Sequence, residues 1–296
     1  MDLKAYLEEK RRTVDEALMG CLPTADGSGG EVTEAMKYSL FAGGKRLRPI
    51  LCMAGAEAVG GDPSSLLPVA CALELIHTYS LIHDDLPVMD DDDMRRGKPT
   101  NHKVFGEAVA LLAGDGLLTE AFRLMAGEGS SAGLEPRRLL RAIALIGRAA
   151  GWEGMVGGQV VDILSEGKEV APDTVEFIHT HKTGALITAS VVSGALLGGG
   201  DDRQGAALTR YGENIGLAFQ IADDILDIEG DSALLGKGVG ADARKKKITY
   251  PTVMGLEASR KIEKEMIREA LEALRSFDHR ADPLRRIASY IIERKK

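Results

Sequence analysis

The sequence has few aromatic residues and few cysteines. Only 4% of its 296 residues are Phe, Trp or Tyr, although 44% are hydrophobic. Such a core must be built mainly from Leu, Ile, Val, Ala and Met, which favours packed helices over a sandwich of strands. The three cysteines, Cys21, Cys52 and Cys71, form no CxxC pair. They therefore argue against a disulfide framework or a zinc site, and favour reduced thiols in the cytoplasm.

A basic surface and a long membrane-spanning run are also missing. The formal net charge of −8 argues against general nucleic-acid binding, although it leaves room for a local basic pocket. The most apolar stretch, residues 184–200, is too short and glycine-rich to span a bilayer comfortably, so we expect a buried central helix there. Residues 1–18 lack the apolar centre of a secretory signal. We therefore expect a cytoplasmic protein that is not an integral membrane protein.

Apolar residues recur at helical spacing between short breaks rich in Gly, Pro and Ser. We expect about ten helices and no convincing strand. Pro172 or Asp173, followed by Glu176, is typical of a helix start. No break is long enough to separate two domains, so the sequence predicts an all-α, single-domain protein over residues 1–296. The clearest helical segments are residues 66–84, 203–228, 252–276 and 283–294, and the first of these is apolar nearly all round.

Three aspartates, Asp223, Asp224 and Asp227, lie in the predicted helix of residues 203–228. Helical residues four apart share a face, so Asp223 and Asp227 point the same way. Like charges at this spacing repel each other, and an unpaired carboxylate among apolar residues costs far more. A positively charged group must therefore neutralise them.

A second acidic cluster places six aspartates within residues 84–93. Asp84 and Asp90 cannot share one face of a regular helix. Pro87 lacks an N–H and clashes with the preceding turn, so it stops the helix. We expect the helix to end near Leu86 and a short loop to bring Asp90 beside Asp84.

Opposed carboxylates without His or Cys suit a hard divalent cation, of which Mg²⁺ is the leading choice. Because Mg²⁺ usually borrows ligands from a phosphate, a site with few protein ligands predicts a phosphorylated substrate. Calcium storage is disfavoured, since the loop lacks the alternating Asp/Asn and closing Glu of an EF-hand. We interpret Asp91, Asp92 and Asp93 as solvated surface.

Basic residues flank both clusters. They lie in three segments: "GGKRLRP" with Lys45, Arg46 and Arg48, "RRGKP" with Arg95 and Arg96, and "GKGVGADARKKKITYP" with Lys237 and residues 244–247. Arg forks and Lys charges are used for phosphate recognition. Together with the acidic clusters, they predict binding of more than one phosphate group.

These segments resemble those of the trans-prenyl diphosphate synthases. "LIHDDLPVMDDDDMRRGKP" is similar to the family's first aspartate-rich motif and "GLAFQIADDILD" to its second. "GGKRLRP", "HKTGAL", "GQVVDI" and "GKGVGADARKKKITYP" match further motifs in the family's order, from about residue 31 onward. The resemblance implies the isoprenoid synthase fold, a bundle of mostly antiparallel helices around a deep central cavity, usually as a homodimer.

The resemblance also implies a reaction. An allylic diphosphate ionises to a carbocation, the double bond of isopentenyl diphosphate attacks it, and loss of a proton leaves a chain one isoprene unit longer. The departing diphosphate is the expected base. Mg²⁺ ions, about three per active site, neutralise the leaving group.

Site residues follow from the same resemblance. The implied metal ligands are Asp84, Asp90 and Asp223, with Asp227, Asp85 and Asp224 supporting through metal-bound water. The allylic diphosphate is expected at Arg95, Lys182, Lys237 and Lys247, and isopentenyl diphosphate at Lys45, Arg48, His77 and Arg96. Thr183, Gln220 and the Lys182 carbonyl are expected to face the carbocation. Gln159 and Asp162 are given supporting roles, and His179 and His181 structural ones.

Product length is expected to depend on residues about one helical turn, roughly 6–7.5 Å, before Asp84. These residues are Tyr79 and Ser80. Tyr79 and the two extra residues within "DDLPVMD" resemble bacterial farnesyl diphosphate synthases. Residues 94–115 look equally like geranylgeranyl diphosphate synthases, so that product stays open although farnesyl diphosphate is favoured.

Two other classes of function compete. A terpene cyclase shares the helical architecture and the metal chemistry, but the "GGKRLRP" segment, which would bind a second diphosphate, speaks against it. A non-enzymatic subunit of a helical assembly would have no reason to keep both acidic clusters.

Overall fold

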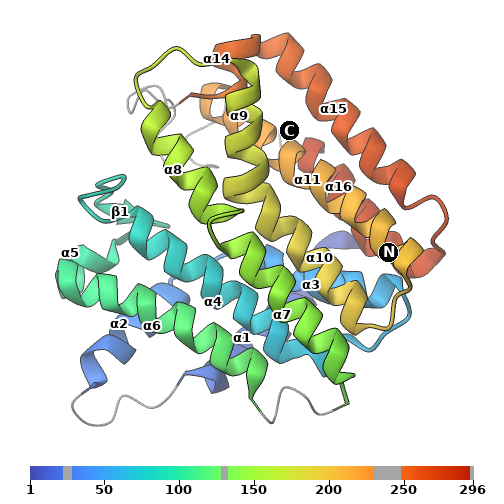
Figure 1. Ribbon diagram of the computed structural model, residues 1–296, viewed down its shortest axis with the longest axis horizontal. Coiled ribbons are helices and arrows are strands. Elements are labelled where there is room, and N and C mark those ends of the chain that lie inside the picture. Colours follow the sequence, from blue (N-terminus) through green and yellow to red (C-terminus); the bar gives the residue numbers. More distant parts are fainter. Residues whose placement is uncertain (23–28, 128–132, 230–247, 294–296) are drawn as a thin grey trace.

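The computed structural model describes residues 1–22, 29–127, 133–229 and 248–293, and these are almost entirely helical (Figure 1). The first part of the chain contains α1 (Leu3–Cys21), α2 (Gly30–Leu40), α3 (Leu47–Ala58), a 3₁₀ turn η1 (Pro63–Leu66), α4 (Leu67–Asp84), strands β1 (Met94–Arg95) and β2 (Lys98–Pro99), α5 (Asn101–Phe105), α6 (Glu107–Ala126) and α7 (Pro136–Ala150). The remainder contains α8 (Met155–Ser165), α9 (Pro172–Ile178), a π-helix η3 (His179–Gly184), α10 (Ala185–Leu197), α11 (Asp202–Glu229), α14 (Tyr250–Met254), α15 (Leu256–Ala273), a 3₁₀ turn η4 (His279–Ala281) and α16 (Asp282–Glu293).

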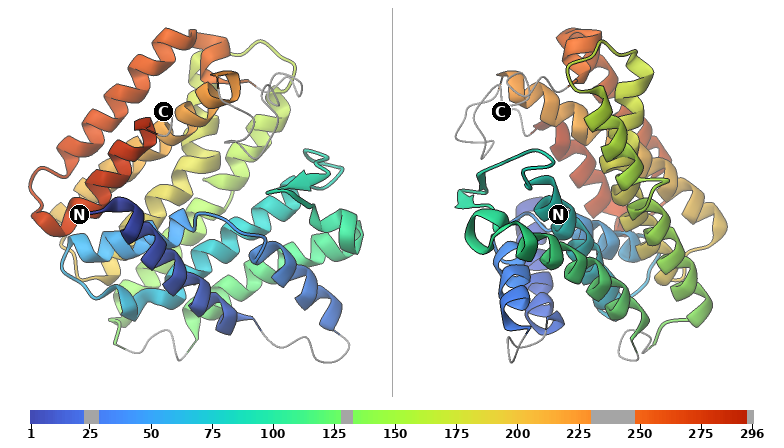
Figure 2. Two further views of the ribbon diagram at one scale, coloured as in Figure 1. Left: turned by 180° about the vertical axis from the view of Figure 1, so that it is seen from behind. Right: turned by 60° about the vertical axis from the view of Figure 1, so that its left-hand side comes forward.

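The helices form two groups that meet along α10. Helices α2, α4 and α6 lie together on one side, and α11, α15 and α16 lie together on the other (Figures 1 and 2). Between them, α10 packs against α3, α7 and α11. One hydrophobic core is centred on α4 and α6, and another on α3, α11 and α16.

The composition of each long helix explains its place. The α10 residues carry no charge and most are buried, which confirms the buried central helix expected at residues 184–200. Helix α4 is apolar on nearly all sides and is also buried. Together with η1 it is long and apolar enough to cross a membrane by length and composition, but 67% of its most apolar window is buried inside the protein. It is therefore a core helix of this fold.

Several local expectations need correction. The predicted helix over residues 252–276 is divided into α14 and α15 at Gly255, whose φ of 82° is accessible to glycine. Helix α9 does begin at Pro172, but its N-terminus has no side-chain cap, so Asp173 and Glu176 form no capping box. The described residues also contain more than ten helices and one small hairpin, in which Met94 pairs with Pro99.

Candidate active site

The first acidic cluster follows the C-terminus of α4. The helix ends at Asp84, and the chain turns back so that the Asp90 N–H donates to the Asp84 carbonyl over 2.9 Å. The Asp91 N–H donates to the Leu86 carbonyl over 3.1 Å and closes the same turn. This geometry confirms the predicted stop at Pro87 and brings Asp90 beside Asp84.

The β1–β2 hairpin places Arg95 against the next aspartate. The Arg95 Nε lies 2.8 Å from both carboxylate oxygens of Asp85, and its Nη2 lies 2.6 Å from Oδ1. Asp85 is buried, and this hydrogen-bonded pairing raises the pKa of Arg95 despite the opposing effect of burial. Arg95 is thus held at the edge of the acidic cluster. The expected role of Asp85 with metal-bound water stays a prediction.

Helix α8 and the π-helix η3 form a polar bridge between the two acidic clusters. Gln159 on α8 donates from Nε2 to Asp84 Oδ1 over 3.0 Å. Three residues later on the same helix, Asp162 accepts from Lys182 Nζ over 2.6 Å. A Cβ on Gly158 would lie only 2.2 Å from the backbone nitrogen of Lys182, so α8 can approach η3 this closely only because residue 158 is glycine.

The second acidic cluster lies on α11, and its aspartates differ in burial. Asp224 is buried and accepts hydrogen bonds on Oδ2 from His179 Nε2 (2.8 Å) and from the Tyr250 N–H (2.9 Å). It therefore fastens α11 to η3 and α14. Asp223 and Asp227 are half-buried, and their spacing of four residues places them on one face of α11.

The chemistry of these side chains fits Mg²⁺. The half-buried aspartates offer hard oxygen ligands, and Gln159 Oε1, a further amide oxygen, is buried beside Asp84 without a hydrogen-bond partner among the described residues. Within the same part of the chain no three His, Cys, Asp or Glu side chains already converge as a metal cage. A diphosphate is the kind of group that completes the coordination shell of Mg²⁺ beside such carboxylates.

A separate group of basic residues, Arg48, His77 and Arg96, here called the positive group, lies where α3 begins. Arg48 is in the first turn of α3, His77 is on α4, and Arg96 extends from the hairpin to donate to the Gly43 carbonyl. Arg48 Nε is buried and has no hydrogen-bond partner within the described ranges. Neighbouring Arg46 differs, because it is paired with Asp15 and Glu74 at 2.7 and 2.9 Å.

The electrostatics of this group indicate an anion site. Burial, opposed by Glu74 and assisted by the Arg96 charge, lowers the pKa of Arg48 to about 10. Burial also lowers the pKa of His77 well below its usual value, and the charges of Arg48 and Arg96 add to the effect. Positive groups that destabilise one another in this way are stabilised when a polyanion binds between them.

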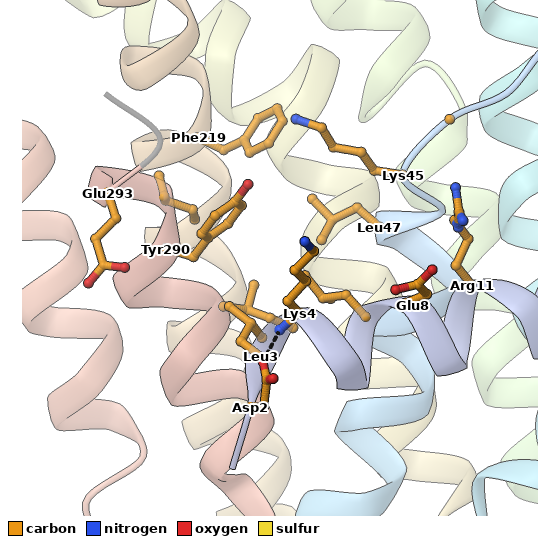
Figure 3. A pocket seen from close by; sticks show the side chains of 14 residues that line it. Asp2, Leu3, Lys4, Glu8, Arg11, Lys45, Leu47, Phe219, Tyr290 and Glu293 are labelled. Carbon is orange, nitrogen blue, oxygen red and sulfur yellow. Dashed lines mark hydrogen bonds between the residues drawn. The ribbon is translucent and has the colours of Figure 1, made fainter. Parts of the chain in front are cut away.

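Lys45 lies in the loop that precedes α3 and lines a cavity of about 640 Å³. The cavity is bounded by α1, α11 and α16, and the Lys45 side chain extends toward Phe219 (Figure 3). Phe219 directly precedes Gln220 on α11, so the loop and α11 meet at this cavity.

The remaining predicted site residues fall in three places. Thr183 and Gln220 are half-buried on η3 and α11, which pack together. Tyr79 is buried on α4, where burial and the Asp84 charge raise its pKa to about 12, whereas the Ser80 hydroxyl donates to the His77 carbonyl of its own helix. Lys237 and Lys247 lie outside the described residues.

Sequence reasoning missed some of this arrangement. It gave no sign of the π-helix that carries Lys182 and Thr183, a rare form that is frequent at functional sites. It read His179 as structural, which agrees with the Asp224 contact, but did not identify that partner. The "GQVVDI" segment did signal Gln159, although not its bond to Asp84.

Comparison with known proteins shows the family to which the chain belongs. A family model described as polyprenyl synthetase matches residues 30–287. The chain belongs to the polyprenyl synthetase family. Its relatives within this family include a chloroplastic heterodimeric geranylgeranyl pyrophosphate synthase large subunit from Arabidopsis thaliana, which is 50% identical over 99% of this chain and 80% of that protein. Farnesyl diphosphate synthase from Geobacillus stearothermophilus is 48% identical over 99% of this chain and 97% of that one.

Solved structures of the polyprenyl synthetase family share the fold. An FPP/GFPP synthase from Zymomonas mobilis has a TM-score of 0.87 and 38% identity, covering 98% of both chains. A geranylgeranyl pyrophosphate synthetase from Pyrococcus horikoshii has a TM-score of 0.89 and 34% identity, again covering 98% of both. The predicted all-α isoprenoid synthase fold is therefore confirmed.

Proposed function

We propose that this polyprenyl synthetase condenses isopentenyl diphosphate with an allylic diphosphate, dimethylallyl or geranyl, to make farnesyl diphosphate. The observation that carries the proposal is the set of hydrogen bonds that links the acidic clusters. Gln159 on α8 bonds to Asp84, Lys182 on η3 bonds to Asp162 on α8, and His179 on η3 bonds to Asp224 on α11. This set supports one site with carboxylates on two helices. Geranylgeranyl diphosphate is the alternative product, since several relatives are named for it.

The two substrates have separate positions in this proposal. Asp84, Asp90, Asp223 and Asp227 would hold Mg²⁺, which would supply the positive charge that makes the diphosphate of the allylic substrate a better leaving group. Arg95 and Lys182, with Lys237 and Lys247 in the undescribed segment, hold that diphosphate by charge-assisted hydrogen bonds.

The second diphosphate belongs to the metal-free positive group. Arg48, His77 and Arg96 bind the diphosphate of isopentenyl diphosphate, and Lys45 contributes from the same loop. The buried Nε of Arg48, which lacks a partner in the described structure, supports this assignment because a phosphate oxygen would satisfy it. Anchoring one substrate apart from the other fixes the direction in which its double bond attacks.

In this proposal, dipoles of the protein stabilise the carbocation. Thr183 and Gln220 come from two elements that pack together, and their side-chain oxygens and the Lys182 carbonyl supply negative ends of dipoles. The released diphosphate is expected to take the proton, so no side chain needs to act as the base.

Tyr79 is proposed as the floor that ends chain growth. It is buried one turn before Asp84, and the effect of the Asp84 charge on its pKa supports its nearness to the carboxylates. Ser80 has a lesser influence, because its hydroxyl is bound to its own helix. Tyr79→Ala is expected to lengthen the main product, which chromatography would detect.

We further propose a cytoplasmic homodimer in which residues 1–296 form one domain. Free cysteines favour a reducing compartment. Exposed apolar side chains on α6, α7 and α8 are suited to a partner subunit. Examples are Leu112, Leu140, Val160 and Leu164. Light scattering that gives a monomer mass would contradict the dimer.

The direct test is incubation of the purified chain with Mg²⁺, isopentenyl diphosphate and dimethylallyl diphosphate, followed by product sizing. A farnesyl product that requires all three components supports the proposal. Turnover of an allylic diphosphate without isopentenyl diphosphate would indicate a cyclase instead. No turnover by the chain alone would favour the non-enzymatic subunit.

A further inference from the structure

His83, which directly precedes Asp84, fills a notch between α4 and α6. Its Nε2 lies 2.9 Å from the Leu111 carbonyl and 4.0 Å from Asp115 Oδ1. A carbonyl only accepts hydrogen bonds, so Nε2 carries the proton. A Cβ on Gly114 would lie 2.0 Å from this nitrogen and 2.4 Å from Cδ2, so the imidazole occupies space that exists only because residue 114 is glycine.

The His83 imidazole also contacts the ring of Tyr79. The two rings meet edge to face, with centroids 5.6 Å apart and an interplanar angle of 78°. This is a favourable arrangement for aromatic rings. Since Tyr79 and His83 are four residues apart on α4, they share a face of the helix, and His83 contacts both the Tyr79 ring and α6.

We propose that His83 is a positioning residue for product length, which acts by holding the Tyr79 ring where the growing prenyl chain stops. This inference rests on the proposed function, in which Tyr79 is the floor. Without the imidazole, the Tyr79 ring gains access to other rotamers and leaves the cavity deeper. His83 itself touches neither substrate, so its effect passes through Tyr79.

The test measures the ratio of geranylgeranyl to farnesyl product. His83→Ala removes the ring, and His83→Gln removes the ring but keeps a donor that can reach the Leu111 carbonyl. Each is expected to raise the ratio several-fold, up to about tenfold, which matches the strength of an aromatic pair. His83→Phe keeps a ring and is expected to retain the wild-type product. Arg123→Ala, on the exposed side of α6, is the control.

A double variant separates positioning from general loss of packing. If His83 acts through Tyr79, Tyr79→Ala with His83→Ala gives the same product distribution as Tyr79→Ala alone. Further lengthening in the double variant, or unchanged products in both His83→Ala and His83→Gln, would overturn the inference. A wild-type enzyme that makes no prenyl product would instead overturn the proposed function.

Discussion

Replacing Arg48 by methionine is expected to weaken binding of isopentenyl diphosphate while leaving the fold at least as stable. The half-buried guanidinium is a positive charge near Arg96, and its buried Nε has no hydrogen-bond partner among the described residues. Its charge therefore costs folding free energy and is useful only when an anion binds. Methionine keeps the apolar stem of the side chain and removes the charge.

The magnitude follows from the pKa of Arg48. Its fall to about 10 means that Arg48 stays charged at neutral pH, but that its charged form is less stable in the folded protein than in the unfolded chain. The free-energy cost is about 3 kcal/mol before solvent screening, and about 1–2 kcal/mol after it, because the side chain is half-buried. The unfolding midpoint should therefore rise by roughly 2–4 °C. Loss of a charge-assisted contact to phosphate should raise KM for isopentenyl diphosphate about 30-fold or more.

Arg46→Met is the matched control two residues away. Arg46 is buried and paired with Asp15 and Glu74, so its removal leaves a carboxylate without its partner. Breaking such a pair costs about 3–5 kcal/mol, and the unfolding midpoint should fall. Thermal unfolding and steady-state kinetics on both variants decide the matter. A lower midpoint and an unchanged KM for Arg48→Met would refute the assignment of Arg48 to an anion site.

Two further predictions concern the bridge and the positive group. Gly158→Ala is expected to lower the free energy of unfolding by about 1–3 kcal/mol, because the alanine Cβ would clash with the Lys182 backbone. The value of kcat should fall about tenfold or more, because Lys182 has to move. An unchanged kcat would contradict this prediction. The low pKa of His77 keeps its side chain neutral in the folded protein. The stability of the fold is therefore unaffected by His77 above about pH 6.5, and it falls at lower pH because the unfolded chain takes up a proton there. A bound diphosphate raises that pKa, so calorimetry near pH 6 in two buffers should detect proton uptake on binding of isopentenyl diphosphate, and no uptake would count against His77.

Much of the fold could be predicted because its main helices are long and their patterns are local. Residues 66–84 and 203–228 correspond closely to α4 and α11. The stop at Pro87 was also local, and it placed Asp90 beside Asp84 correctly. The division of residues 252–276 was missed because an isolated glycine within a helical pattern is often tolerated.

The contacts within the site depended on tertiary packing and could not be read from spacing. Nothing in the residues around Asp224 shows that it turns toward His179 and Tyr250. The π-helix η3, which carries Lys182, packs against both α8 and α11. These contacts join segments far apart in the sequence, so spacing alone could not predict the position of Lys182. Family resemblance identified which residues matter, whereas the structure showed how they are held.

The most direct measurement is Mg²⁺-dependent release of pyrophosphate by Asp84→Ala, Asp223→Ala and the double variant, compared with the wild type. If carboxylates on two helices act as one metal-binding unit, each single variant loses most of the wild-type turnover, about a thousandfold or more, and the double variant is little worse than either. Full turnover by the double variant, with products unchanged, would contradict the account.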